Sequence, residues 1–138
     1  MAPGKDPTAE TRAEAALQHV RAAALALPQG TEKLSHGAPS FFIGDKKCFT
    51  MLHDDHHGDG RLAIWCPAPD GAQAEMVDED PERFFVPPYV GWRGWLGVRL
   101  DVRPDWDEVA AIVTDAYRCV APKRLLAELD QQHRERPR

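Results

Sequence analysis

The sequence is poor in the features that mark several large classes of protein. Only three of its 138 residues are cysteine, and Cys48, Cys66 and Cys119 are widely spaced and odd in number, which argues against a disulfide framework and against a zinc knuckle. No apolar run approaches the roughly 18 residues of a membrane helix. The first residues lack the apolar segment of a secretory leader. We therefore expect a cytoplasmic protein that has no membrane partner.

A surplus of positive charge is missing as well. The chain has 17 Lys and Arg against 22 Asp and Glu, a net charge of −5 and a pI near 5.6. Six of the acids and no base lie in residues 70–82, and without them the rest of the chain carries a net charge of +1. Phosphate binding needs a positive surface, so this balance weakens a general affinity for nucleic acids but leaves room for a local basic patch.

Catalytic signatures are also absent. The sequence has no Gly-rich phosphate loop, no Gly-x-Ser-x-Gly turn and no His-Glu-x-x-His pair. We therefore predict no catalytic residues, no cofactor and no metal, and we favour a binding protein over an enzyme while leaving the enzyme open.

Hydrophobic periodicity predicts helices and strands in an order typical of an α+β domain. An Ala-rich helix is expected over residues 10–27, a short acidic helix over 72–78, a helix from Asp105 as N-cap to Val120, and a last turn or two over 123–129. Strands are expected over residues 31–36, 40–43, 46–52, 61–66 and 94–100, with a Pro-rich edge segment over 81–89.

Short connections between the first four strands favour an antiparallel meander over βαβ units. The predicted architecture is an antiparallel sheet packed against N- and C-terminal helices. We expect one domain over residues 10–129, with flexible tails over 1–9 and 130–138.

Three segments of the sequence share a pattern with a known family: Gly37–Gly44 (GAPSFFIG), Phe85–Trp95 (FVPPYVGWRGW) and Ala116–Leu125 (AYRCVAPKRL). Together they resemble the MmcQ/YjbR-like family. The resemblance runs from the first helix to about Leu126. It implies a two-layer fold of the CyaY-like or double-wing type, and it implies DNA binding without a set of catalytic residues.

Residues 89–95, the aromatic–glycine segment, are the most suggestive part of the sequence. Tyr89, Trp92, Arg93 and Trp95 place rings and a guanidinium between glycines, a pattern that can stack on bases or on a planar ligand. The alternative is that the Trp rings cover the end of the core and the glycines only permit a turn.

Four cations form a second candidate set. Lys46 and Lys47 follow a predicted hairpin turn, and Lys123 and Arg124 follow Pro122 at the start of a helix, where phosphate or carboxylate would be attracted. Alternatively, the lysines protect an edge strand, and the Lys123–Arg124 pair is solvated or pairs with the acidic helix.

Histidines form a third set. The run His53–Asp59 has three imidazoles and three carboxylates, which suits either a divalent metal or, as we expect, a solvated loop. His36 is interpreted as a hydrogen-bonded structural residue in preference to an acid–base group. The three thiols are expected to be buried and inert.

These observations together predict a small non-catalytic protein that binds double-stranded DNA through the aromatic–glycine segment and the four cations. The alternative is a module that binds a small molecule or another protein, in a pocket walled by Trp92 and Trp95, and does not bind DNA.

Overall fold

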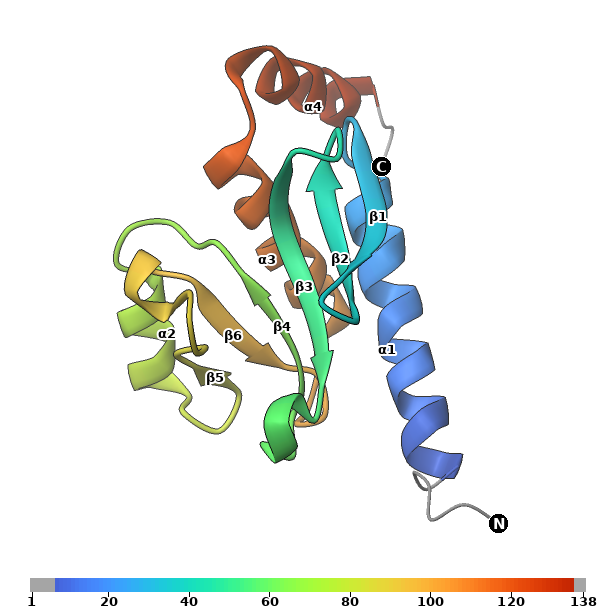
Figure 1. Ribbon diagram of the computed structural model, residues 1–138. Coiled ribbons are helices and arrows are strands. Elements are labelled where there is room, and N and C mark those ends of the chain that lie inside the picture. Colours follow the sequence, from blue (N-terminus) through green and yellow to red (C-terminus); the bar gives the residue numbers. More distant parts are fainter. Residues whose placement is uncertain (1–6, 136–138) are drawn as a thin grey trace.

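The computed structural model describes residues 7–135 (Figure 1). Its helices are α1 (Pro7–Leu25), α2 (Ala72–Glu79), α3 (Trp106–Val120) and α4 (Lys123–Glu135). Its strands are β1 (Gly30–Ser35), β2 (Ala38–Ile43), β3 (Lys47–Asp54), β4 (Leu62–Cys66), β5 (Phe84–Phe85) and β6 (Leu96–Arg99). Two 3₁₀ turns, η1 (His56–Gly58) and η2 (Gly91–Arg93), complete the order. Over residues 7–135, no helix is both long and apolar enough to cross a bilayer.

All six strands form one antiparallel sheet in the order β1-β2-β3-β4-β6-β5. The first four strands are neighbours in sequence, so the predicted meander is confirmed. The chain then leaves the sheet through α2, returns as β5 at the edge and inserts β6 between β5 and β4. The prediction of an edge strand in the Pro-rich segment is confirmed too, although only Phe84 and Phe85 pair.

The main core lies on one face of the sheet, against α1 and α3 (Figure 1). Val20 and Ala24 of α1 and Val109 and Val113 of α3 are buried there, as their helical spacing predicts. The side chain of Asp105 caps α3 by accepting hydrogen bonds from the backbone N–H groups of Asp107 and Glu108, which confirms the predicted N-cap.

A smaller apolar cluster lies on the opposite face of the sheet. Its buried members are Ala63, Trp65, Phe85 and Trp95, which come from β4, β5 and the chain just before β6. Period-2 alternation explains the division, because Leu96 and Val98 face the main core while Trp95 faces the other way.

The helices at both ends run past the predicted limits. α1 begins at Pro7, inside the predicted tail 1–9, and α4 continues to Glu135, so the expectation that the helix ends near Leu129 is wrong. Leu125 and Leu129 are buried in the main core and hold α4 against the rest of the molecule. Residues 1–6 and 136–138 of the predicted tails lie outside the described residues, and the domain limits 10–129 stay a prediction.

Candidate functional site

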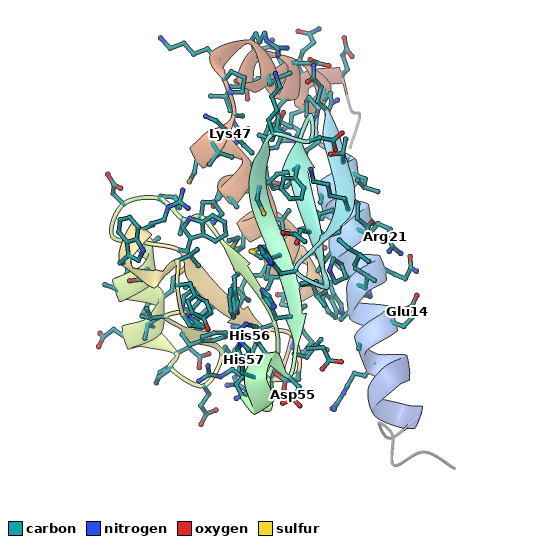
Figure 2. All side chains as sticks on the ribbon, viewed as in Figure 1. Glu14, Arg21, Lys47, Asp55, His56 and His57 are labelled. Atoms are coloured by element: carbon teal, nitrogen blue, oxygen red, sulfur yellow. The ribbon has the colours of Figure 1, made fainter. Side chains whose placement is uncertain are left out.

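Three of the four predicted cations meet at one end of the sheet. A hollow of about 220 Å³ lies between the β2–β3 turn and the start of α4, and Lys46, Lys47 and Arg124 line it together with Pro122. Lys123, the first residue of α4, is exposed next to Arg124. Figure 2 shows Lys47 at this end of the molecule, below α4. We call Lys46, Lys47, Lys123 and Arg124 the cationic end.

Local sequence fixes both halves of the cationic end. Gly44 and Asp45 have φ values of 55° and 62°, and the N–H of Lys46 donates to the carbonyl of Ile43 at 3.0 Å, which is the pattern of a type I′ hairpin turn. Thr31 Oγ1 donates to Asp45 Oδ1 at 2.7 Å and ties the turn to β1. The lysines that follow are therefore presented by a turn of fixed shape.

Pro122 shapes the other half. Its carbonyl accepts hydrogen bonds from the N–H groups of Leu125 and Leu126, which starts α4. Within residues 7–135, the N–H groups of Lys123 and Arg124 donate no hydrogen bond to any other residue. The positive end of the helix dipole thus adds to the charge of the side chains.

Carboxylates do not neutralise the cationic end. Across residues 7–135, none of its four side chains has an acidic partner within 4.0 Å. Two acids of the 70–82 segment are paired elsewhere: Asp80 lies near Arg83 and Arg103, and Glu82 accepts from Arg103 at 3.1 Å. The predicted pairing of Lys123–Arg124 with this acidic segment is not found.

These ion pairs lie at the opposite end of the sheet. β6 runs from Leu96 to Arg99, and the backbone N–H of Arg99 donates to the carbonyl of Arg83. The guanidinium of Arg83 forms an ion pair with Glu108. Arg99 itself is paired with Asp101 at 2.9 Å. β3 and β6 are parallel to each other with β4 between them, so the acid-rich network lies where they end and the cationic end lies where β3 begins.

The aromatic–glycine segment divides between surface and interior. Trp92 is 85% exposed and Tyr89 is 71% exposed, and Arg93, the residue after Trp92, is exposed too. Trp95 is only 6% exposed, so it cannot stack on a ligand at the surface as predicted. Its ring lies beneath Arg93, whose guanidinium is 5.5 Å from the ring centroid. Neither Trp92 nor Trp95 lines any of the three hollows described in this section.

Gln73 of α2 holds this segment in place. Its Nε2 donates to the carbonyl oxygens of Gly91 at 2.8 Å and Trp95 at 2.6 Å, and so spans η2. The segment enters β6 at Leu96. On the sheet, Gly97 of β6 pairs with Trp65 of β4, which in turn pairs with Met51 of β3. Strands lie about 4.8 Å apart, so Trp95 lies about 10 Å from β3 at the end of the sheet where β3 begins.

Two residues of the histidine run, His53 and His56, differ from the predicted solvated loop, and the other five are exposed as expected. His53 belongs to β3, and its ring lies against Trp65 with 3.8 Å between centroids and 34° between planes. His56 of η1 contacts both rings and lies 5.9 Å from Tyr89. Burial, and next the nearby His56, lowers the pKa of His53 to about 4. His53 Nε2 and Trp65 Nε1 are both buried without a hydrogen-bond partner.

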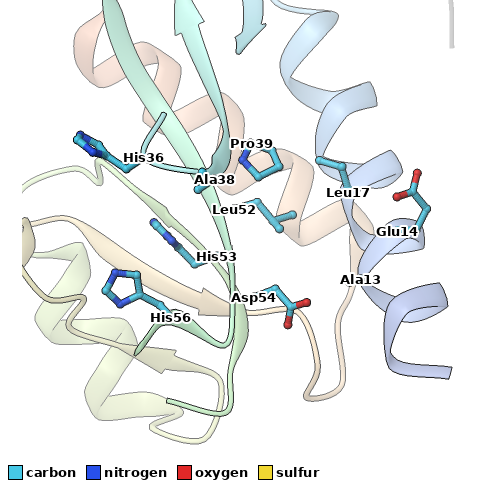
Figure 3. A pocket seen from close by; sticks show the side chains of 11 residues that line it. Ala13, Glu14, Leu17, His36, Ala38, Pro39, Leu52, His53, Asp54 and His56 are labelled. Atoms are coloured by element: carbon cyan, nitrogen blue, oxygen red, sulfur yellow. The ribbon is translucent and has the colours of Figure 1, made fainter. Parts of the chain in front are cut away.

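A larger hollow of about 780 Å³ opens below the β1–β2 hairpin (Figure 3). His36, His53 and His56 line it from the hairpin, β3 and η1, and Leu17 of α1 lines it from the other side. His36 is exposed with a φ of 51° and no side-chain partner in residues 7–135, so its interpretation as a hydrogen-bonded structural residue is wrong. In the same part of the chain, no group of three or more His, Cys, Asp or Glu is arranged to hold a metal.

A third hollow, of about 350 Å³, lies between α1, α3 and α4. His19 and Trp106 line it as a stacked pair, with 4.1 Å between ring centroids and 5° between planes. Ala22 and Ala23 of α1 and Ala26, which follows the helix, also line it. None of the predicted site residues contributes to this hollow.

The three thiols are free and differ in exposure. Cys66 is buried in the main core, Cys48 is half-buried and Cys119 is exposed, so the expectation of buried thiols holds for Cys66 alone. Burial raises the pKa of each of the three thiols above its ordinary value. None of them is an activated nucleophile.

Comparisons with known proteins agree with this fold. The family model described as YjbR matches residues 25–119. The crystal structure of the Deinococcus radiodurans protein DR2400, described with the domain DUF419, superimposes with a TM-score of 0.66 over 83% of this chain and 87% of that one, at 14% sequence identity. No curated protein matches the chain in sequence. The family model covers more than half of the sequence, and the chain therefore belongs to the YjbR family.

Proposed function

We propose that this protein is a non-catalytic, cytoplasmic DNA-binding protein whose cationic end contacts the phosphate backbone of the duplex. The convergence of Lys46, Lys47 and Arg124 on one hollow, beside Lys123 and without acidic partners, is the observation that supports it. The exposed free thiol of Cys119 supports a reducing compartment.

Phosphate contacts of this kind release counterions, so affinity must fall with salt. Four contacts give a slope of about −3.6 in log affinity against log salt, or roughly a 100-fold loss of affinity between about 50 and 200 mM. A mobility-shift titration of duplex DNA with the protein at both salt concentrations measures this slope. The cationic end offers charge and two backbone N–H groups, groups that suit phosphate oxygens, so we expect contacts to the DNA backbone to outnumber contacts to base edges.

The double variant Lys46→Ala/Lys47→Ala tests the assignment. It should bind more weakly at low salt and should reduce the slope to about −1.8, because two of the four contacts are gone. The matched control is Arg12→Ala/Arg134→Ala, which removes the same charge from exposed positions on α1 and near the end of α4. No band shift at micromolar wild-type protein and low salt would refute DNA binding, and equal slopes for the two double variants would refute the site.

A second candidate function is the binding of a small molecule in the 780 Å³ hollow. This volume lies in the range of ligand pockets, about 300–1,000 Å³, and three imidazoles converge on it with Leu17 and Leu52. Thermal-shift measurements across a panel of metabolites test it, with His56→Ala as the variant that should lose any stabilisation found. A panel that shifts the wild type and this variant equally would place the ligand elsewhere.

A further inference from the structure

Two large aromatic side chains are exposed on a segment that the fold holds firmly. Trp92 and Tyr89 are the two most exposed aromatic rings among the large apolar side chains of residues 7–135, at 85% and 71%. Gln73 closes the segment through two carbonyl groups, and the N–H of Arg93 donates to the carbonyl of Val90 at 3.0 Å. The exposure of Trp92 is therefore built into an ordered turn.

The backbone at Tyr89 is strained. Its φ is 67°, and the N–H of Val90 donates to the carbonyl of Pro88 at 2.7 Å, so Tyr89 is the central residue of a γ-turn of the rare positive-φ form. Such a conformation costs free energy and persists only where surrounding contacts impose it. Here it directs a ring into solvent, and no contribution to the core compensates for it.

One exposed cation, Arg93, lies beside these rings in the sequence. Arg93 is exposed next to Trp92 and lacks an acidic partner within the described residues. The segment enters the sheet at the end where the cationic end lies, with one strand between β3 and β6. The start of β6, which Trp92 and Arg93 precede, therefore lies toward the same end of the sheet as the cationic end, and two acids of the 70–82 segment, Asp80 and Glu82, are ion-paired toward the other end.

We propose that this surface takes DNA as a single strand, with unpaired bases stacked on Trp92 and Tyr89 and phosphates at Arg93 and the cationic end. The inference rests on the proposed function and deepens it: a duplex is held through its phosphates alone, and a single strand is bound more tightly because its bases also stack on the rings. In a duplex the faces of the bases are covered because the bases stack on one another, so an exposed aromatic side chain can reach only the edges of the bases. A single strand presents those faces, and stacking on aromatic side chains is tolerant of sequence.

Fluorescence anisotropy of a labelled oligothymidylate of about 15 nucleotides, against a duplex of equal length, tests the proposal. Wild-type protein should bind the single strand more tightly than the duplex. Trp92→Ala should weaken single-strand binding about tenfold and leave duplex binding unchanged, and Trp92→Phe should restore most of the loss, because it keeps a ring. Intrinsic fluorescence should be quenched on binding in the wild type and not in Trp92→Phe.

Leu34→Ala is the matched control, since Leu34 is an apolar side chain of edge strand β1 that is 72% exposed. It should leave both affinities unchanged. Equal affinity for both oligonucleotides, or a Trp92→Ala variant that binds the single strand as tightly as the wild type, would overturn the single-strand inference and leave DNA binding in place. Absence of binding to either oligonucleotide at low salt would overturn the proposed function itself.

Discussion

Replacing Tyr117 with phenylalanine removes a single oxygen atom from the centre of the core. Tyr117 is fully buried, and its hydroxyl donates to the carbonyl of Pro28 at 2.7 Å, joining α3 to the chain that follows α1. Without this donor, the carbonyl of Pro28 is left unpaired in an apolar setting, at a cost of about 2 kcal/mol. For a domain of this length, that loss lowers the midpoint of thermal unfolding by roughly 6 °C.

Chemical denaturation with urea, followed by tryptophan fluorescence, measures the free energy of unfolding. Tyr89→Phe is the matched control, because it removes the same atom from an exposed ring, and it should change stability by less than about 0.5 kcal/mol. Equal stability of Tyr117→Phe and the wild type would refute the argument.

Alkaline pH gives a second test of the same hydroxyl. Burial raises the pKa of Tyr117 to about 12, whereas the phenol of the unfolded chain ionises near 10. Stability that depends on the protonated phenol is complete below pH 10 and is lost as pH rises toward 12. The difference between wild type and Tyr117→Phe should therefore be constant up to about pH 10 and should narrow above it.

Three further predictions follow from other parts of the fold. Gly97→Ala should destabilise the protein by about 2 kcal/mol in urea denaturation, because a Cβ there would lie 2.5 Å from the ring of Phe85, and stability within 0.5 kcal/mol of wild type would contradict the packing. His53 should stay neutral in an NMR titration down to about pH 5, because its pKa is lowered from 6.5 to about 4. The stability that it contributes is therefore complete above pH 6.5 and falls by about 3 kcal/mol as pH drops toward 4, and His53→Phe should lose this pH dependence. A thiol reagent should label Cys119 rapidly in the native protein and Cys66 only after unfolding, and equal rates would show that the core opens.

The sequence predicts those parts of the fold that depend on local patterns. The alternation of Leu96, Val98 and Leu100 against Trp95 and Gly97 places each on the correct face, because the period of a strand fixes the side of every residue. The stripe on α3 and its Asp105 cap follow from helical spacing in the same way. The end of α4 is missed because no Gly or Pro stops the helix before Pro137, and a predicted end at Leu129 had no such signal behind it.

The candidate site is predicted only as separate fragments. That Lys46 and Arg124 line one hollow depends on how α4 packs across the β2–β3 turn, which no local pattern records. The hydrogen bonds from Gln73 to the aromatic–glycine segment could not be predicted, because in the sequence Gln73 is only one more polar residue of an acidic helix. The position of His53 could have been predicted from the sequence. It follows Met51 by two residues on β3, so the alternation of a strand directs it to the face that carries Trp65.

The two helices that cover the main core come from opposite ends of the chain. α1 precedes every strand and α3 follows every strand, yet they pack together over one face of the same sheet. Contacts between distant parts of a chain slow folding, because the loop between them must close before the contacts can repay its entropy. A nascent chain emerging from the ribosome therefore displays an apolar sheet face until α3 has been synthesised, and during that interval it depends on chaperones more than a domain built from neighbouring segments would.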